Sequence, residues 1–288
     1  MEKNEKNLQK PSKMIIYRVF RAILGKIYKF WYNPKITGWE NIPKEGPIVV
    51  VGNHIHIMDQ CNVIISTKRK IHYMAKKEYF DPQYKEGHHG WFFRSAGCIP
   101  VDRKIHDDNA KGAALEVLKE KHALGLFPEG TRNGLKEERV HELYDKYIDS
   151  EKEDYGSFSN RMKKTKNSQI TYLEELLDKK KITKKDLVNH IDKVDEYLKE
   201  LVSKKVITKN DYYDHIYLPF KFGAVSMAHK TDALIVPFVI TGEYKFRSKN
   251  LNVIIGKPMK VTDDLEKSNN ELRKIMIDLY KESSKNEW

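Results

Sequence analysis

The sequence predicts an α/β fold in which a mostly parallel sheet is flanked by helices, with two additions to that core. From residue 35 onward, short apolar runs alternate with segments of helical periodicity, a pattern typical of parallel sheets. The stretch 135–217 interrupts this alternation, because it is highly charged and contains no proline. The first 34 residues are basic and aromatic. We therefore expect an N-terminal amphipathic interfacial helix at 1–34, the α/β domain at 35–134 and 218–288, and an all-helical insertion at 135–217.

The composition limits the class of protein. The 288 residues, 40% of them hydrophobic, suffice for one large domain or a domain with an appendage. A charged fraction of 33% and a mean hydropathy of -0.68 argue against an integral membrane protein. No apolar run reaches the ~18–20 residues that span a bilayer, and the charged N-terminus lacks the apolar core of a signal peptide. Two cysteines without CxxC spacing favour a reducing compartment.

The charge distribution indicates an anionic partner. The formal net charge is +12 and the isoelectric point is about 9.3, which suits nucleic acid, anionic lipid or a phosphorylated substrate. The insertion contains equal numbers of basic and acidic residues, so the rest of the chain carries the whole excess. The first 34 residues alone hold eight basic and two acidic side chains. We expect no nucleic acid partner, because the chain contains no recognisable nucleic-acid-binding motif.

The segment Met14–Tyr32 is predicted to form an amphipathic helix. Arg18, Arg21 and Lys29 share one helical face with Gly25. The opposite face carries six apolar residues, namely Ile16, Phe20, Ile23, Leu24, Ile27 and Trp31. Such a helix can lie among the headgroups of an anionic membrane or pack on its own domain. Its terminal position and cationic character favour the membrane.

The core elements follow in order along the chain. Five apolar runs are predicted strands: Pro47–Val51, Gly97–Val101, Ala123–Phe127, Leu234–Ile240 and Leu251–Ile255. Between them, Asp107 or Asp108 can cap a helix that runs to about Lys121. A last helix is expected to begin at a capping box of Ser268 and Glu271 and to dock by an apolar stripe.

The insertion contains an internal repeat. Residues 176–191 align with residues 201–216, and in each copy a threonine precedes an aspartate by three positions, Thr183 with Asp186 and Thr208 with Asp211. This spacing predicts two capping boxes and a small array of helical hairpins. His190 and His215 also recur. They are paired ligands or packing residues, and the packing interpretation is favoured.

One predicted strand end carries a candidate base. His54 and Asp59 follow the Pro47–Val51 strand, at the sheet edge where open α/β folds bind their ligands. An imidazole paired with a carboxylate is held in one tautomer and becomes a better base. A buried histidine that bonds an aspartate is also an ordinary core feature, so the pair alone is weak evidence. The Gly-x-Ser-x-Gly pattern of serine nucleophiles is absent, so the base would activate a hydroxyl brought by the substrate.

Two further strand ends carry arginines. Phe127-Pro-Glu-Gly-Thr-Arg132 and Ile99-Pro-Val-Asp-Arg103 each follow a predicted strand. Arginine binds phosphate through two parallel hydrogen bonds. Either arginine alone would more often form a surface ion pair, but three strand ends together can supply one base and two guanidinium groups to a single crevice.

Four ordered segments resemble the glycerolipid acyltransferases, the 1-acyl-sn-glycerol-3-phosphate acyltransferases and their relatives. These segments are Asn53-His54-x4-Asp59, Gly90-Trp-Phe-Phe-Arg94 leading to Arg103, Phe127-Pro-Glu-Gly-Thr-Arg132, and Ile235-Val-Pro-Phe-Val239. The resemblance covers residues 35–134 and 218–260. It implies that His54 deprotonates the acceptor hydroxyl, which attacks an acyl thioester without a covalent enzyme intermediate, and that Asp59 orients His54.

The resemblance also implies the binding residues. Glu129, Gly130, Thr131 and Arg132 would hold the glycerol phosphate. Lys76 and Arg103 match basic positions expected to contact phosphate, and Pro237 lies in the segment expected to shape the acyl or acceptor site. Relatives often have serine two places after the histidine, where this chain has His56, which leaves the local hydrogen bonds in question. No metal and no cofactor are expected, and His88 and His89 receive no role.

The implied function is transfer of a fatty acyl group from acyl-CoA or acyl carrier protein to the free hydroxyl of lysophosphatidic acid or a related phosphate-bearing lipid, in phospholipid biosynthesis. The expected partners are anionic membrane lipids, the acyl donor and the acceptor, and the expected location is the cytoplasmic side of the membrane, by peripheral association. The alternatives are acylation of glycerol 3-phosphate or another lysolipid, thioester hydrolysis, and a non-catalytic membrane-binding protein. The insertion, which follows Arg132, is a lid or partner surface on one hypothesis and a tolerated loop insertion on the other.

Overall fold

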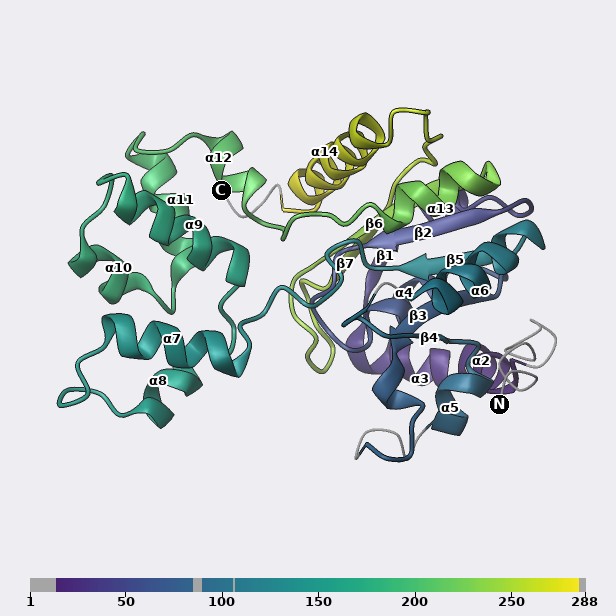
Figure 1. Ribbon diagram of the computed structural model, residues 1–288, viewed down its shortest axis with the longest axis horizontal. Coiled ribbons are helices and arrows are strands. Elements are labelled where there is room, and N and C mark those ends of the chain that lie inside the picture. Colours follow the sequence, from purple (N-terminus) through teal and green to yellow (C-terminus); the bar gives the residue numbers. More distant parts are fainter. Residues whose placement is uncertain (1–13, 85–89, 106, 285–288) are drawn as a thin grey trace. The chain divides into compact units, whose positions relative to one another are not determined.

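Seven strands form one mostly parallel sheet in the computed structural model, which describes residues 14–84, 90–105 and 107–284 (Figure 1). In chain order they are β1 (Lys35–Thr37), β2 (Ile48–Gly52), β3 (Ile71–Lys76), β4 (Ile99–Val101), β5 (Ala123–Leu126), β6 (Leu234–Thr241) and β7 (Asn252–Ile255). Across the sheet their order is β1-β7-β6-β2-β5-β3-β4. Every neighbouring pair is parallel except β6 and β7. The predicted α/β fold with a mostly parallel sheet is confirmed.

The central strands are apolar on both faces because helices cover both. All five residues of β2 are buried, as expected for a strand in a parallel sheet between two helical layers. On one face, Ile48 and Val50 pack with Met14 and Tyr17 of the N-terminal segment and with Val63 of α4 (Asp59–Ile64). On the other face, α6 (Asp108–Lys119), α13 (Gly223–Thr231) and α14 (Leu265–Ser283) contact the sheet, and α13 contacts both of the other two helices (Figure 1).

Two strands were not predicted. β1 has only three residues, and as an edge strand it is partly exposed. Its sequence therefore contains no apolar run by which a strand could be recognised. β3 contains His72 and Lys76, which break its apolar pattern, yet it lies between β5 and β4. His72 is fully buried, and its ring Nδ1 donates a hydrogen bond to the carbonyl oxygen of Gly97 at 2.9 Å, which satisfies one of the two ring nitrogens.

The predicted helix starts are partly right. Asp107 caps α6 by accepting a hydrogen bond from the Ala110 amide, as expected. The predicted capping box of Ser268 and Glu271 is wrong, because α14 already begins at Leu265 with Asp264 as its cap. Ser268 instead lies buried inside the helix, where its hydroxyl accepts a hydrogen bond from the Thr262 amide at 3.0 Å.

The N-terminal segment consists of α2 (Ile15–Val19), a π-helical turn η2 (Phe20–Leu24) and α3 (Gly25–Tyr32). Tyr17, Gly25 and Tyr28 face the domain and are buried. The prediction that Gly25 shares the exposed cationic face is therefore wrong, since a Cβ at this position would lie 3.0 Å from the Ile65 side chain. Residues 1–13 of the predicted 1–34 segment lie outside the described residues.

The outward side of this segment is largely apolar. Seven large side chains are exposed there: Ile15, Val19, Ile23, Leu24, Ile27, Phe30 and Trp31. Arg18 and Arg21 are exposed as well. Within residues 14–84, 90–105 and 107–284, none of the helices combines the length and hydropathy that crossing a bilayer requires.

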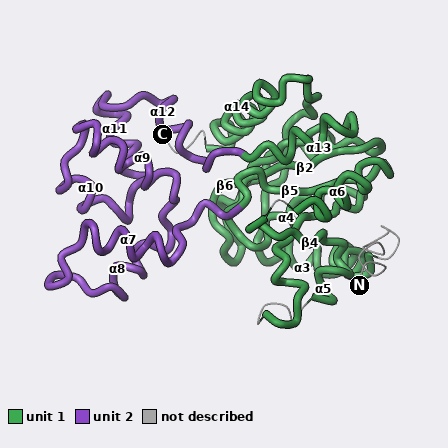
Figure 2. Tube along the Cα trace, in the orientation of Figure 1, with its two compact units in different colours: residues 1–130, 221–287 green, residues 131–220, 288 purple. Residues whose placement is uncertain are grey.

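The chain divides into two compact units (Figure 2). Unit 1 holds the sheet and comprises residues up to Gly130 and from Lys221 onward, while residues 131–220 form unit 2. Two smaller 3₁₀ turns, η3 (Trp39–Asn41) and η4 (Lys77–Tyr79), and the short α5 (Gly90–Ser95) complete unit 1. Residues 218–222 precede α13 without joining it.

Unit 2 is helical throughout its regular structure. Its helices are α7 (Glu137–Tyr147), α8 (Tyr155–Met162), α9 (Asn167–Asp178), α10 (Lys184–His190), α11 (Val194–Ser203) and α12 (Lys209–Asp214). Both predicted capping boxes are present, at the starts of α10 and α12. His190 and His215 stack on tyrosine rings, 4.0 Å from Tyr197 and 3.6 Å from Tyr172 between centroids, in agreement with the favoured packing interpretation.

Candidate active site

One side chain joins the end of β2 to β6 by two hydrogen bonds. The buried Asn53 donates from Nδ2 to the Ile240 carbonyl oxygen at 2.9 Å, and its Oδ1 accepts from the Ile240 amide at 2.8 Å. The side-chain amide of Asn53 therefore continues the hydrogen bonding between β2 and β6 for one residue beyond the end of β2. The preceding Gly52 makes room for the Phe238 ring, to which a Cβ would come within 2.1 Å. The chain can then turn away sharply at His54.

The next residues form a compact turn around the Asp59 carboxylate. Its Oδ2 lies 2.8 Å from Nδ1 of His54 and accepts hydrogen bonds from the amides of Ile55 and His56 at 2.7 and 2.8 Å. Asp59 is fully buried, whereas the His54 side chain is 18% exposed. The carboxylate therefore fixes the ring through Nδ1, and Nε2 remains as the nitrogen that can exchange a proton with a substrate.

Aromatic side chains pack against one face of the His54 ring. The His54 ring stacks on Phe127, which directly follows β5, with 4.1 Å between centroids and 9° between planes. Phe127 in turn contacts Tyr73 of β3 and Phe238 of β6. The stack holds the ring in the plane that its bond to Asp59 requires. The arrangement can take a proton from a hydroxyl that a substrate brings to Nε2.

Neither cysteine is suited to nucleophilic catalysis. Cys61 is buried in α4 and Cys98 is mostly covered, and both are free thiols. Burial raises the pKa of each thiol to about 12, so the reactive thiolate form is scarce at neutral pH.

Tyr244 is a site residue that the sequence analysis missed. It lies in the loop between β6 and β7 and donates a hydrogen bond from its hydroxyl to Oδ1 of Asp59 at 2.8 Å. Its ring also stacks on His56 with 4.2 Å between centroids, which gives the unusual histidine of the motif a packing role. A separation of 185 residues along the chain and the absence of a motif around Tyr244 leave no sequence pattern that would have found it.

The predicted cations of unit 1 lie beyond neighbouring strand ends. Lys76 ends β3 and lies 3.7 Å from Glu78, while the exposed Arg103 follows β4 by two residues. Because β2, β5, β3 and β4 are parallel neighbours, their carboxyl ends meet at one sheet edge. The structure thus brings Lys76 and Arg103 to the same edge as His54.

The Pro-Glu-Gly turn after β5 is tightly built. Gly130 has a positive φ of 72°, which favours glycine, and its amide bonds the Phe127 carbonyl oxygen at 3.0 Å. Glu129 is buried at 4% exposure. A second missed residue, Lys221, lies over this turn, since a Cβ at Gly130 would come within 2.9 Å of its Nζ.

The remaining predicted binding residues, Thr131 and Arg132, begin unit 2 and are described with it. Arg132 is exposed and Thr131 is half-buried. His88 and His89 lie outside the described residues. Over the part of the chain that the structure describes, no group of three or more His, Cys, Asp or Glu side chains is arranged to hold a metal ion.

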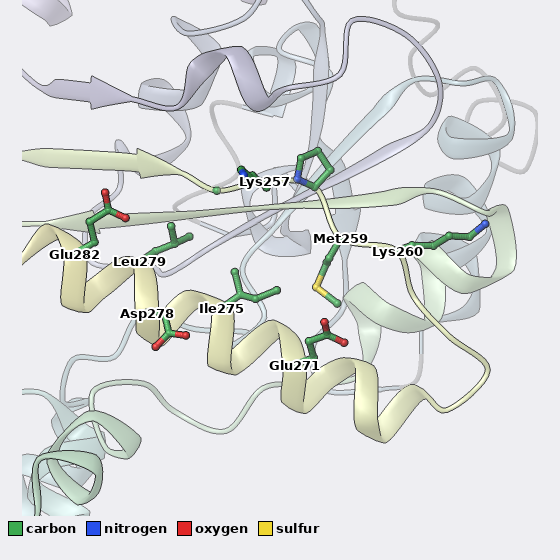
Figure 3. A pocket seen from close by; sticks show the side chains of 10 residues that line it. Lys257, Met259, Lys260, Glu271, Ile275, Asp278, Leu279 and Glu282 are labelled. Atoms are coloured by element: carbon green, nitrogen blue, oxygen red, sulfur yellow. The ribbon is translucent and has the colours of Figure 1, made fainter.

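An open groove of about 420 Å³ lies elsewhere in unit 1, between α14 and the segment after β7 (Figure 3). Its charges are mixed, with Lys257 and Lys260 on one side and Glu271, Asp278 and Glu282 on the helix. None of the predicted site residues lines it. The groove is therefore lined by residues other than those of the candidate site.

Comparison with known proteins identifies the family. Residues 33–241 match the acyltransferase family, a span that includes the turn at His54 and the Pro-Glu-Gly turn. The chain belongs to the acyltransferase family. The family's matched region also includes the whole of unit 2, so this acyltransferase carries its helical unit inside the family domain.

Two relatives share part of the sequence. A 1-acyl-sn-glycerol-3-phosphate acyltransferase of Bacillus subtilis is 31% identical over 99 residues, which cover 34% of this chain and 48% of the relative. A 1-acyl-sn-glycerol-3-phosphate acyltransferase of Borreliella burgdorferi is 32% identical over 100 residues, 34% of this chain and 38% of the relative. The chain thus spans half or less of the length of these relatives.

The fold has a counterpart among solved structures. The crystal structure of the 1-acyl-sn-glycerophosphate (LPA) acyltransferase PlsC from Thermotoga maritima matches with a TM-score of 0.51 and 16% identity, covering 97% of this acyltransferase and 86% of that chain. At this identity the match establishes the shared fold.

Proposed function

We propose that this acyltransferase moves a fatty acyl group from an acyl thioester to the free hydroxyl of lysophosphatidic acid or a related phosphate-bearing lipid, in phospholipid biosynthesis. The observation that carries the proposal is the half-buried His54, fixed through Nδ1 by the buried Asp59 at 2.8 Å. The acceptor class is supported by the two relatives that are 1-acyl-sn-glycerol-3-phosphate acyltransferases.

The geometry suits direct transfer by general-base catalysis. His54 Nε2 takes the proton of the acceptor hydroxyl as its oxygen attacks the thioester carbonyl carbon. The carbon–sulfur bond then breaks, and the imidazolium returns the proton to the leaving thiolate. Asp59 stabilises the imidazolium between these two steps and keeps the ring from rotating. Direct transfer without a covalent acyl-enzyme intermediate is supported by the burial of Cys61. Burial raises the pKa of this thiol to about 12, so it is a poor nucleophile at neutral pH.

Cations at the sheet edge supply the phosphate site in this proposal. Lys76 ends β3 and Arg103 follows β4, two strands of the same parallel set as β2, which leads to His54. Arg132 follows the Pro-Glu-Gly turn. Arginine offers the forked geometry that suits phosphate, and we add Lys221 as a further cation beside Gly130. Glu129, Gly130 and Thr131 of the Pro-Glu-Gly turn complete the proposed glycerol phosphate site, in which the buried Glu129 would contact the glycerol part because a carboxylate repels phosphate.

For the acyl donor, we propose only its chemical class, an acyl thioester. An acyl-CoA or an acyl carrier protein presents the thioester next to anionic groups, which the net charge of +12 favours. No cofactor and no metal enter the proposed reaction.

The exposed apolar side of the N-terminal helices is the proposed lipid contact. Ile23 and Ile27 are 59% and 55% exposed, and aromatic rings at Phe30 and Trp31 extend the same segment. Large exposed apolar surfaces on soluble domains mark interaction sites, and nearby Arg18 and Arg21 suit anionic headgroups. We propose peripheral association with the cytoplasmic side of the membrane.

An assay of the purified protein tests the proposed reaction. Lysophosphatidic acid, glycerol 3-phosphate and other lysolipids are offered with a panel of acyl-CoA and acyl carrier protein thioesters, and the acylated products are identified by mass spectrometry. We expect transfer to lysophosphatidic acid, and we expect His54→Ala to reduce turnover about 10²-fold or more because the general base is lost. Thioester hydrolysis without acyl transfer, or full turnover in His54→Ala, would contradict the proposal.

A matched variant controls for nonspecific effects of losing a histidine. His229 lies in α13 with 40% of its side chain exposed, so His229→Ala removes an imidazole outside the site. This variant is expected to keep the turnover of the original chain.

A further inference from the structure

A buried chain of hydrogen bonds links helix α3 to the Asp59 carboxylate. The Tyr28 hydroxyl donates to Oδ1 of Asn62 at 2.8 Å, and Nδ2 of Asn62 donates to the Tyr244 hydroxyl oxygen at 2.7 Å. The Tyr244 hydroxyl then donates to Oδ1 of Asp59 at 2.8 Å. These groups come from α3, from α4 and from the loop after β6, and they meet at the carboxylate that holds His54.

The donor and acceptor roles in this chain are fixed by chemistry. An amide oxygen can only accept, so the Tyr28 hydrogen points to Asn62. An amide nitrogen can only donate, so the Tyr244 oxygen accepts from Asn62. The Tyr244 hydrogen then goes to Asp59, because a carboxylate is a stronger acceptor than the nearby Tyr28 hydroxyl oxygen. Tyr28 and Asn62 therefore decide where the Tyr244 hydrogen points.

Both tyrosines remain donors at ordinary pH. Burial, followed by the nearby Asp59, raises the pKa of Tyr244 far above its usual value. Burial likewise raises the pKa of Tyr28. Asn62 has no exposed surface, so water does not replace any bond that the chain loses.

The loop that carries Tyr244 is also packed directly on α3. The Tyr32 ring meets the Tyr244 ring edge-on at 5.4 Å, and the Trp31 ring meets Phe246 at 4.9 Å. The carbonyl oxygen of Trp31 accepts a hydrogen bond from the Arg247 amide. Tyr244 is thus held by α3 through its ring and its loop, and its hydroxyl is linked to α3 through Asn62.

We propose that Tyr244 is a positioning residue for the His54–Asp59 pair, and that Tyr28 and Asn62 hold it in the orientation that does so. The consequence for turnover rests on the proposed function, whereas the effect on the pair itself does not. Tyr244 supplies the bond on the carboxylate oxygen that His54 does not use, so it stops the carboxylate from rotating and spreads its charge over both oxygens.

Removal of the Tyr244 hydroxyl has a defined electrostatic result. In Tyr244→Phe, Oδ1 of Asp59 loses its donor, so the carboxylate charge concentrates beside the ring. The pair then holds a proton more tightly, whichever of its atoms carries it. The other titratable groups near the carboxylate are Cys61, Tyr28, Tyr73 and His56, and the substitution changes none of them.

The experiment is a pH titration of His54 by nuclear magnetic resonance on protein labelled with ¹⁵N-histidine, in which His54 is assigned by the signals lost in His54→Gln. We expect Tyr244→Phe to move the His54 midpoint to higher pH, and Tyr28→Phe to move it the same way by less. Tyr17→Phe is the matched control, because it removes another buried hydroxyl of the N-terminal helices, one that bonds the Arg69 carbonyl oxygen at 2.7 Å. An unchanged midpoint in Tyr244→Phe, or an equal shift in Tyr17→Phe, would overturn the proposal.

Turnover provides the second readout. In the acyl transfer assay, Tyr244→Phe should lower kcat about tenfold with little change in KM, since the lost bond to a charged group orients the base and does not touch substrate. If the original chain transfers no acyl group, the proposed reaction fails while the titration still decides the positioning role. If Tyr244→Phe does not fold, Tyr28→Phe decides, and a His54 midpoint equal to that of the original chain would count against the proposal.

Discussion

At the residue scale, Asp59 and His54 differ in burial, and this difference suits the two tasks proposed for them. Asp59 is fully buried and accepts bonds from His54, from two backbone amides and from Tyr244. A carboxylate held by four donors cannot rotate, so the imidazole that it orients is already in place before a substrate arrives. The ring itself stays 18% exposed, as the proposed contact with an acceptor hydroxyl requires.

A different histidine, His72, makes stability depend on pH. It is fully buried in β3, and burial lowers its pKa from 6.5 to about 4. Between these values the unfolded chain binds a proton that the folded chain does not, so the free energy of unfolding falls as pH falls from 6.5 towards 4. We expect His72 alone to remove about 2 kcal/mol of stability between pH 7.5 and pH 5, measured by urea unfolding at the two pH values.

The control for this prediction is His72→Asn. Asparagine keeps an N–H donor for the Gly97 carbonyl oxygen but does not titrate in this range. The variant should therefore lose less stability than the original chain over the same pH interval. Equal losses in the two proteins would show that other groups cause the acid sensitivity.

At the element scale, the sequence predicted those features that depend on local residue patterns. The β2 strand was found from its apolar run, and the capping boxes at Thr183 and Thr208 were found from their spacing. β3 was missed because His72 interrupts it and is stabilised by a distant carbonyl group. Tyr244 was missed because its role arises only when the loop after β6 folds against α3 and α4.

The N-terminal helices illustrate the same limit. Helical periodicity placed Gly25 with the cations, but the π-helical turn η2 changes the angular register between α2 and α3. As a result Tyr17, Gly25 and Tyr28 all face the domain. The outward side, with Ile23 and Ile27, is then the surface whose membrane contact can be tested.

We expect the double substitution Ile23→Ser and Ile27→Ser to weaken binding to vesicles of anionic phospholipid about tenfold or more, because each isoleucine contributes on the order of 1.5 kcal/mol or more when buried in lipid. Binding is measured by sedimentation with sucrose-loaded vesicles, at low and high salt. Both side chains are mostly exposed, so the fold should not change. Trp39→Ser is the comparison, because Trp39 is 59% exposed, the same fraction as Ile23, but lies outside these helices. Equal loss in both variants would remove the special role of the segment.

At the scale of the whole molecule, the net charge is distributed unevenly between the helical insertion and the rest of the chain. Residues 135–217 have no net charge, and the remaining chain carries the full +12. Residues 131–220 form a compact helical unit of their own, with a buried interior that includes Leu143, Leu173 and Leu198. Residues 135–217 add no net charge that would attract anionic substrates over distance, so any role of this segment in the reaction, apart from that proposed for the preceding Arg132, would have to be steric or through a partner.

That argument leads to the last prediction, on the lid hypothesis. Residues 136–216 are replaced by a short flexible linker, which leaves Arg132 in the chain. We expect unit 1 to tolerate the change, because the Lys221 amide donates a hydrogen bond to the Pro128 carbonyl oxygen at 2.9 Å. This bond joins the two segments of unit 1 between which the helical unit is inserted.

If the helical unit covers bound acceptor, the shortened protein should bind vesicles normally but accept a wider range of lysolipid headgroups, with a higher KM for lysophosphatidic acid. The measurement is kcat and KM for each acceptor in the same vesicles. Unchanged selectivity and turnover would leave the unit as an insertion that the acyltransferase domain merely tolerates, while loss of vesicle binding would assign it to the membrane contact instead.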